Sequence, residues 1–392
     1  MIEYIILIIS LIYLFFKGYK KVFNHFWSIQ PVFHIHNIFN LFKMKTIINP
    51  DLPKLNKYCN LIDIKTNYFE YISDNTLIDV INFLKKNYTD PFNGKYICEI
   101  NSFKPYFESC KNSSFVSIYN QNKILNYNNS LIDSREIVGV VTSRPVNITF
   151  KNNNIFPAYL IDNLCSNKNK DIEFQLIQTH EYFQRHNSKN TKISLFKCQN
   201  NRNDIVPLVS FEKYNFTIDE RKYNNELNNM FNGYYNIVKI TEQNINLFIN
   251  FVYKNKEKFT CLILPDYANL LNLIKNENIF IYVLLVKSNI ECCYIFRNSN
   301  LMYNNNKSIE CFASINNSND FNIFVNGFYY SLMKINKILN CKYLLIETLS
   351  HNNVIIDDLY EKFHLNFINP YTYLLYNYIH YPLFKNEVFA LV

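Results

Sequence analysis

The sequence predicts an α/β protein built from two similar halves that share one sheet. In each half the hydrophobic pattern runs in the order helix, strands, helix, strand, and the halves join near residues 215–235. No low-complexity tract separates them. Hydrophobic residues make up 48% of the 392-residue chain, which is enough for a substantial core. We therefore expect a large double domain rather than two tethered domains.

Three segments of the first half have clear secondary-structure signals. Capping side chains at 73–76 precede apolar residues at helical spacing from Leu77 to Leu84, which predicts a helix. The β-branched run 136–150 predicts a strand that lies at a sheet edge or carries a bulge, because Pro145 interrupts it. A second helix is expected over residues 173–184.

The second half repeats these signals. Thr241 is expected to cap a helix whose apolar residues run from Ile245 to Val252. Farther along, a long amphipathic helix is predicted over residues 324–339. Strands are predicted at 260–264, 279–286, 290–296 and 342–349.

The N-terminus carries an apolar run that stands apart from this pattern. Residues 4–16 read YIILIISLIYLFF, and Lys17, Lys20 and Lys21 follow. The run is short for a transmembrane span, which needs about 20 residues, and it lacks the flanks of a cleavable signal peptide. Two interpretations stay open: a buried N-terminal helix, or a membrane anchor formed by residues 1–21. The lysines would place the domain that follows an anchor on the cytoplasmic face of the membrane, and without an anchor the protein is expected to be cytoplasmic.

Composition excludes several classes of function. The chain has five glycines, none spaced as in GxGxxG or a P-loop, so nucleotide-binding enzymes of those classes are excluded. The net charge of +8 is scattered rather than clustered, which argues against a nucleic-acid partner. The ten cysteines form no CxxC and indicate buried reduced thiols, so we expect no metal site.

Four motifs then suggest a family. Residues 24–32 read NHFWSIQPV, like the signature FWxTQPV, and residues 138–148 read VGVVTSRPVNI, like VGFISxxPxNI. Residues 160–165 read LIDNLC where that family has EINFLCV, and residues 373–378 read YLLYNY, like YYLYNW. In this order and at this spacing, the four stretches resemble the glycylpeptide N-tetradecanoyltransferases, or N-myristoyltransferases.

The resemblance implies a fold and an activity. The implied fold is two GNAT-type acetyltransferase-like halves that share a saddle-shaped mixed sheet. Residues 22–214 would bind acyl-CoA, and residues 215–392, which end in a buried C-terminus, would bind the peptide. The implied reaction transfers a myristoyl group from myristoyl-CoA, as co-substrate, to the N-terminal glycine amine of proteins. No permanently bound cofactor is implied.

The resemblance also assigns catalytic positions. The backbone amides of Asn163 and Leu164 would stabilise the thioester oxygen, and the C-terminal carboxylate of Val392 would act as the base. Counted from the motifs, the tail is about one residue short, which corresponds to ~3.3 Å along a strand. Asp162 replaces an Asn of the family, and its carboxylate would bind the glycine ammonium or act as the base itself.

The CoA moiety would be held at two places. Near the start of the domain, backbone and ring contacts would come from Asn24, His25, Phe26 and Trp27. After the LIDNLC segment, a phosphate loop that leads into a helix would use Lys168, Lys170 and Asp171. Two lysines at this spacing also fit an ordinary solvated turn.

Departures from the family pattern keep an alternative open. Phe196 stands where the family has a Thr that assists the base, and Glu212 replaces a His of the peptide pocket, which would favour a basic residue in the peptide. The segment 365–370 lacks the glycines of the family's loop. The alternative is a pseudo-enzyme that binds acyl-CoA or peptide with weak or no catalysis. A transferase for another acyl chain, or for lysine side chains, is a further possibility.

Overall fold

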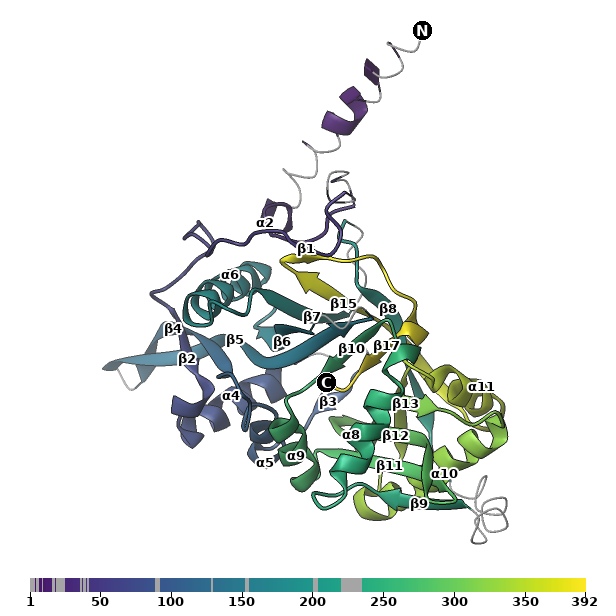
Figure 1. Ribbon diagram of the computed structural model, residues 1–392. Coiled ribbons are helices and arrows are strands. Elements are labelled where there is room, and N and C mark those ends of the chain that lie inside the picture. Colours follow the sequence, from purple (N-terminus) through teal and green to yellow (C-terminus); the bar gives the residue numbers. More distant parts are fainter. Residues whose placement is uncertain are drawn as a thin grey trace.

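The structure is a computed structural model in which most of the chain forms one body around a mixed sheet (Figure 1). It describes residues 4, 7–8, 10–15, 18, 25–35, 37, 40, 42–88, 92–127, 130–151, 155–199, 204–219 and 235–392. Among these residues the sheet has 15 strands, and β1 and β16 form a separate pair. The predicted class, α/β with a large mixed sheet, is confirmed.

The first half contains the predicted helices at 73–84 and 173–184, as α4 and α6. Ser73 caps α4, because its Oγ accepts a hydrogen bond from the Thr76 amide at 3.2 Å. The elements in chain order are α2 (His25–Ser28), β1 (Thr46–Ile47), β2 (Ile64–Tyr68), η1 (Phe69–Tyr71), α4 (Asp74–Asn87), β3 (Lys95–Tyr96), α5 (Ile100–Phe103), η2 (Lys104–Tyr106), β4 (Phe115–Tyr127), β5 (Ser130–Phe150), β6 (Ile155–Ser166), α6 (Lys170–Asn187), β7 (Ile193–Gln199) and β8 (Val209–Thr217).

The second half contains each predicted strand and helix, with two helices, α9 and α11, that were not predicted. The cap of α8 differs from the prediction: Asn244 is the N-cap, and its Oδ1 accepts from the Thr241 amide at 2.6 Å. The elements are β9 (Tyr235–Lys239), α8 (Ile245–Lys254), η4 (Lys256–Lys258), β10 (Cys261–Leu264), α9 (Tyr267–Lys275), β11 (Ile279–Val286), β12 (Asn289–Tyr303), β13 (Asn306–Asn316), α10 (Phe321–Leu339), β14 (Tyr343–Glu347), α11 (Asn352–Lys362), β15 (Leu365–Tyr376), β16 (Tyr378–Ile379), η5 (Lys385–Glu387) and β17 (Val388–Ala390).

The two halves repeat one topology. β4, β5 and β6 form an antiparallel meander, and α6 leads to β7, which pairs parallel to β6. β11, β12 and β13 do the same, and α10 leads to β14, parallel to β13. The next strand of each half then joins the other half: β8 of the first half pairs with β14, and β15 of the second half pairs with β7. In Figure 1 the yellow β15 accordingly lies among the teal strands of the first half. This exchange of strands makes one continuous sheet.

Pro145 does not interrupt its strand, because the sheet leaves a gap beside it. On one side, β5 pairs with β4 as far as Ser143 and with β10 from Asn147 onward, so neither neighbour faces Pro145. A residue without an amide hydrogen is tolerated there because no partner needs it as a donor. Two bulges lie nearby: one in β5 at Val138, opposite β4, and one in β6, opposite residues 140–142.

The C-terminal residues run into the middle of the molecule. β17 pairs parallel to β10, and Phe389, Leu391 and Val392 are at most 4% exposed. The apolar tail packs into core clusters on both faces of the sheet, and Val392 belongs to the same cluster as Leu160, Leu195 and Tyr373. The chain therefore ends inside the protein.

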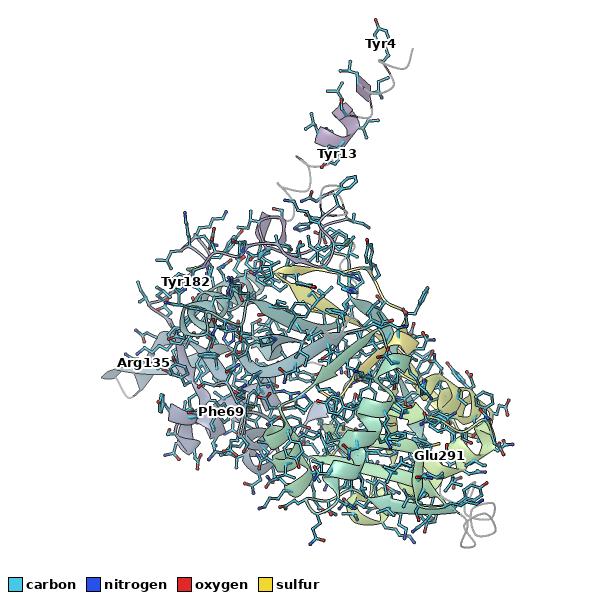
Figure 2. The ribbon with its side chains drawn as sticks, viewed as in Figure 1. Tyr4, Tyr13, Phe69, Arg135, Tyr182 and Glu291 are labelled. Carbon is cyan, nitrogen blue, oxygen red and sulfur yellow. The ribbon has the colours of Figure 1, made fainter. Side chains whose placement is uncertain are left out.

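The apolar N-terminal segment projects from the body. Its described residues are helical, and Leu7, Leu11 and Leu14 are 56–60% exposed. Figure 2 shows Tyr4 and Tyr13 on this projecting segment. The interpretation as a buried helix is therefore wrong for the described residues. No helix of the described part of the chain is long and apolar enough to cross a membrane, so a transmembrane span has no support.

One buried polar group predicts an acid sensitivity of the fold. His180 of α6 is 1% exposed, with its ring nitrogens 2.8 Å from Ser117 Oγ and 2.8 Å from Ser143 Oγ. Burial lowers the pKa of His180 from 6.5 to about 3. The unfolded chain therefore binds this proton at a higher pH than the folded chain does. His180 contributes stability above the unfolded pKa, and this contribution is lost as the pH falls towards the folded pKa.

We expect the substitution His180→Gln to flatten the dependence of stability on pH. The wild-type free energy of unfolding should lose roughly 2–3 kcal/mol from this group between pH 6.5 and 4.5, and the variant should not. The neighbouring Glu181 has a buried carboxyl whose pKa is raised to about 7. Its contribution to the free energy of unfolding changes with pH in the opposite direction. This contribution is the same in both proteins and cancels in the comparison. Urea unfolding at both pH values measures the difference. Equal slopes would contradict the assignment.

Candidate active site

A cavity of about 500 Å³ lies where the two halves meet and contains several of the predicted site residues. Strands β6 and β7 line one side, β12 and β15 line another, and residues 87–107 add an aromatic wall. Asp162, Asn163, Leu164, Lys168 and Val392 all line it. The fold thus brings together residues from the middle of the first half and the last residue of the chain.

The predicted oxyanion position is a β-bulge. Val140 pairs with Cys165 and Thr142 pairs with Asp162, so Asn163 and Leu164 together oppose the single residue between them. Asn163 adopts a left-handed backbone with φ of 52°, and its Nδ2 donates to Thr142 Oγ1 at 3.0 Å. Asn is among the residues that tolerate this conformation best. The bulge geometry that the Asn163–Leu164 amides require is present.

The parallel pairing of β6 and β7 ends just before the bulge. Its last pair is Ile161 with Phe196, although both strands, which are fully described, continue beyond it. On one side of the resulting opening lie Asn163 and Leu164, and on the other lie Lys197 and Cys198. The amides of the bulge therefore have no partner in the β7 ladder and border the cavity instead.

The terminal carboxylate reaches this cavity. Val392 is 4% exposed, and its oxygen accepts a hydrogen bond from Arg297 Nη1 at 2.6 Å. The same guanidinium contacts Glu310 through Nε at 2.7 Å. Counted from the sequence motifs, the tail is about one residue short. Val392 nevertheless lines the cavity and is bound by Arg297.

A buried cluster of charges surrounds Arg297. It contains three cations, Lys197, Lys213 and Arg297, and it contains the carboxylates of Glu310, Glu347 and Val392. Lys213 pairs with Glu310, and Glu347 Oε1 lies 2.5 Å from Lys197 and 3.4 Å from Arg297. Each of the two glutamates thus forms ion pairs with more than one cation. Buried charges persist only when they are paired in this way.

The ionisation of the cluster follows from burial and from these contacts. Burial by itself would raise the pKa of Glu310, but the attraction of Arg297 and Lys213 outweighs it and lowers that pKa. Burial lowers the pKa of Lys197 to about 8. Glu347 opposes this shift, while Arg297 and Lys213 reinforce it. Lys197 is therefore the cation of the cluster that loses its proton most readily.

Asp162 faces the same cavity but is already paired. Its Oδ2 accepts from Arg144 Nε at 3.0 Å, and the Arg144 side chain is only 3% exposed. The guanidinium of Arg144 also lies over the ring of Tyr106, 5.2 Å from the ring centre. The ion pair with Arg144 fixes the position of the Asp162 carboxylate beside the bulge.

The predicted phosphate-binding loop lies at the start of α6. Asn169 caps the helix, with its Oδ1 accepting from the Asp171 amide at 2.9 Å. Lys168 has φ of 71° and lines the cavity, while Lys170 and Asp171 are exposed in the first turn. A helix N-terminus with nearby lysines attracts anions. The cavity therefore reaches the start of α6, where Lys168 and Lys170 lie near the acidic residues Asp171 and Glu173 of the first turn.

The other predicted CoA contacts lie elsewhere. Phe26 is stacked on Phe174 of α6 at 4.3 Å between ring centres, and Trp27 lies 6.5 Å from Phe196, both in a buried core cluster. Neither ring lines the cavity as far as the structure describes it. His25 begins α2, but its side chain lies outside the described part of the chain, and Asn24 lies outside it entirely.

The departures from the family pattern have local structural explanations. Phe196 fills a core position between Trp27 and Tyr376 and also borders the cavity. Glu212 binds Lys385 at 3.0 Å and does not line the described cavity, and its preference for a basic peptide residue stays a prediction. Residues 365–370 form the start of β15, with a bulge against β8, so this backbone forms a strand without glycines.

Sequence reasoning missed the charged cluster, although it left a signal. Lys197 and Glu347 are the only charged residues of β7 and β14, and Arg297 and Glu310 stand next to the apolar runs CCYIF of β12 and CFA of β13. A charged residue in such a run is rarely buried unless it is paired. The strand patterns therefore indicate that partners exist, but which strands bring them together depends on the crossover of β8 and β15.

Comparison with known proteins identifies the fold. No protein-family profile matches the chain, and no curated protein matches it by sequence. By structure, the chain is similar to Saccharomyces cerevisiae N-myristoyltransferase with bound myristoyl-CoA, with a TM-score of 0.69 and 15% identity over 92% of this chain and 94% of that one. A crystal form of the same yeast enzyme with myristoyl-CoA and inhibitors gives a TM-score of 0.67 and 15% identity over 94% of each chain. The chain therefore has the N-myristoyltransferase fold.

Proposed function

We propose that this protein transfers a myristoyl group from myristoyl-CoA to the N-terminal glycine amine of proteins. The observation that carries the proposal is the single cavity that joins the Asn163–Leu164 bulge, the start of α6 with Lys168, and the terminal carboxylate of Val392. Acyl transfer needs an oxyanion site, a place for the CoA phosphates and a charged group near the amine. The cavity offers all three. The fold shared with an enzyme that binds myristoyl-CoA supports this choice of co-substrate.

The cavity suggests how the co-substrate would lie. The thioester oxygen would accept hydrogen bonds from the bulge amides of Asn163 and Leu164, which would stabilise the charge that develops during attack. The CoA phosphates would bind at the start of α6, near Lys168 and Lys170. The aromatic wall at residues 87–107 provides apolar surface for the acyl chain. This arrangement puts acyl-CoA binding mainly in residues 22–214, as the resemblance implies.

The amine would approach from the side of the second half. Near the bulge, Asp162 and the carboxylate of Val392 both carry negative charge that attracts an ammonium group. Each carboxylate is held by an arginine, so its position is fixed before the substrate arrives. The peptide that follows the glycine would extend along residues 215–392.

A second candidate function is an acyl-CoA-binding or peptide-binding pseudo-enzyme. The observation that favours it is the hydrogen bond between Arg297 and the Val392 carboxylate, because a carboxylate that is already bound to a guanidinium is a weak base. In that case the cavity would bind acyl-CoA without transferring the acyl group.

Transfer of a labelled myristoyl group to a glycine-starting peptide tests the proposal. We expect the natural chain to transfer the label, and a chain extended by one C-terminal glycine to be at least about tenfold slower. The reason is that Val392 is 4% exposed, so an added residue must displace its carboxylate from Arg297. Peptides with an acetylated glycine, with and without a lysine, are the controls for the site of transfer.

The outcomes separate the candidates. Transfer only to the free glycine amine supports the proposed function, and transfer to lysine of the blocked peptide indicates another acceptor. Acyl-CoA binding without transfer by the natural chain establishes the pseudo-enzyme. Equal rates for the natural and extended chains would contradict a role for the position of the terminus.

We also propose that the N-terminal segment anchors the protein at the cytoplasmic face of a membrane. The exposed apolar side chains of Leu7, Leu11 and Leu14 on the projecting helix support this, because such a surface is unfavourable in water. A tether next to the bilayer suits an enzyme whose product partitions into lipid.

Replacing Leu7, Leu11 and Leu14 with asparagine is expected to weaken vesicle binding at least about tenfold, because the helix loses its apolar contacts with lipid. Sedimentation of the full chain with phosphatidylcholine vesicles measures the binding. Transfer to a soluble peptide, which does not depend on the segment, serves as the control for folding. Unchanged vesicle binding would show that the segment is not the anchor.

A further inference from the structure

We propose that Lys197 is the catalytic base that takes the proton from the substrate ammonium, a role that the resemblance assigns to the terminal carboxylate. The inference rests on the proposed acyl transfer and deepens it. It is carried by the position of Lys197 at the opening between β6 and β7, opposite the bulge of Asn163 and Leu164.

The opening places Lys197 across from the oxyanion position. The ladder between β6 and β7 ends with Ile161 and Phe196, and Lys197 is the next residue of β7. On β6 the corresponding next residue is Asp162, and the bulge follows it. Lys197, Asp162 and the bulge residues all line the cavity. An amine that attacks a thioester bound at the bulge would therefore react inside a cavity that Lys197 also lines.

The side chain of Lys197 also points to the required face of the sheet. Leu195, two residues earlier, packs with Leu160 and Val392 in one core cluster, and side chains two apart on a strand share a face. On the adjacent strand β15, Lys197 pairs with Tyr373, which belongs to the same cluster. Phe196 faces the other way, towards Trp27. Lys197 is thus on the same face as the chain terminus.

The charged groups around Lys197 come from four neighbouring strands. Glu347 of β14 contacts its ammonium at 2.5 Å, and Arg297 of β12 lies 3.4 Å from the same carboxylate oxygen. Lys213 of β8 lies 3.6 Å from that oxygen as well and pairs with Glu310 of β13. Glu347 is therefore shared among three cations and compensates none of them fully.

Aromatic rings complete the surroundings of Lys197. The rings of Phe211, Tyr371 and Tyr373 lie 5.5–5.7 Å from its Nζ. Its side chain is 16% exposed, so Nζ is largely removed from water while the cavity remains within reach. Burial, with Arg297 and Lys213 nearby, lowers the pKa of Lys197 to about 8 despite Glu347.

The pKa of Lys197 matches the pKa of the ammonium whose proton is transferred. An N-terminal amine has a pKa of about 7.7–8.0, so transfer of its proton to Lys197 is close to isoenergetic. A carboxylate is a far weaker base than an amine, and the Val392 carboxylate already accepts a hydrogen bond from Arg297. The terminus is therefore suited to attract the ammonium, and Lys197 is suited to deprotonate it.

The step balances as follows. The neutral amine of Lys197 takes one proton from the glycine ammonium and becomes an ammonium. The freed glycine nitrogen forms a bond to the thioester carbon, and the carbonyl oxygen becomes an oxyanion at the bulge amides. When the C–S bond breaks, CoA leaves as the thiolate and accepts the second proton of the attacking nitrogen. Lys197 then releases its proton to water.

The test compares Lys197→Met and Lys197→Arg with the wild-type full chain at pH values from 6 to 9. We expect wild-type kcat/KM to pass through a maximum near pH 8, because Lys197 must be neutral while the glycine is an ammonium. Both variants should instead rise with the pKa of the peptide amine and lose about 10²–10⁴-fold in kcat. Binding of myristoyl-CoA and the circular dichroism spectrum should be unchanged, which separates loss of the base from loss of the fold. Lys197→Ala should be partly rescued by trimethylamine, which accepts a proton and cannot form an amide.

The outcomes distinguish this inference from the function on which it rests. If the wild type transfers the acyl group and Lys197→Met keeps the rate and the pH profile, Lys197 is not the base, although the transferase stands. If the rate falls but trimethylamine does not restore it and the pH profile persists, the lysine has a structural role only, and the inference is overturned. If the wild type acylates no amine, both the inference and the proposed function fall.

Discussion

Replacement of Arg297 by methionine is expected to lower the free energy of unfolding by about 3–5 kcal/mol, a large share of the stability of a typical protein. Arg297 is the one residue that contacts Glu310, Glu347 and the Val392 carboxylate together within the described cluster. The substitution leaves three buried carboxylates facing two lysines. Urea unfolding monitored by tryptophan fluorescence measures the loss.

Arg297→Lys is the matched control. A lysine keeps the positive charge but cannot reproduce the planar set of donors that reaches three carboxylates at once. We expect an intermediate loss of stability, because the charge count is preserved and the geometry is not. If methionine and lysine destabilise equally, geometry rather than charge governs the cluster. If methionine has no effect, the buried cluster does not hold the terminus.

The second large effect is expected at the bulge. Asn163→Val should lower kcat of the proposed transfer by about 10²–10³-fold, the effect of losing an oxyanion donor. A β-branched residue is a strong outlier at the φ of 52° that Asn163 adopts, so the backbone is expected to relax and turn the amide away from the cavity. Steady-state kinetics with saturating myristoyl-CoA measures kcat.

Asn163→Gly is the matched control for this position. Glycine adopts positive φ freely and keeps the backbone amide, so kcat should stay within about tenfold of the wild type. Only the hydrogen bond from the side chain to Thr142 is lost, and this contributes about 1 kcal/mol. Equal losses for valine and glycine would show that the side chain of Asn163 matters and that the bulge backbone does not.

Local patterns determined much of the fold. The helices α4, α6 and α10 and the strands β10, β11 and β14 follow from the spacing of apolar residues, because a buried face repeats with the period of the element. Cys292 and Cys293 likewise face different core clusters, as neighbours on a strand must. The position of the bulge and of the α6 start came from the resemblance of the LIDNLC segment to a family motif.

The tertiary structure decided what these elements do together. The rings of Phe26 and Trp27 pack against α6 and β7, since large aromatic side chains stabilise a core wherever one lies within reach, and contact of this segment with CoA stays a prediction. Pro145 lies inside a continuous strand only because β4 and β10 leave a gap beside it. Neither outcome follows from the residues of the segment itself.

The charged cavity shows most clearly which features the sequence determines and which depend on the tertiary structure. The sequence by itself determined that the apolar residues at the end of the chain suit burial. Only the exchange of β8 and β15 between the halves brought Lys197, Lys213 and Arg297 beside Glu310, Glu347 and Val392. The partners of a buried charge are chosen by strand neighbours far apart in the chain, and local periodicity carries no information about them.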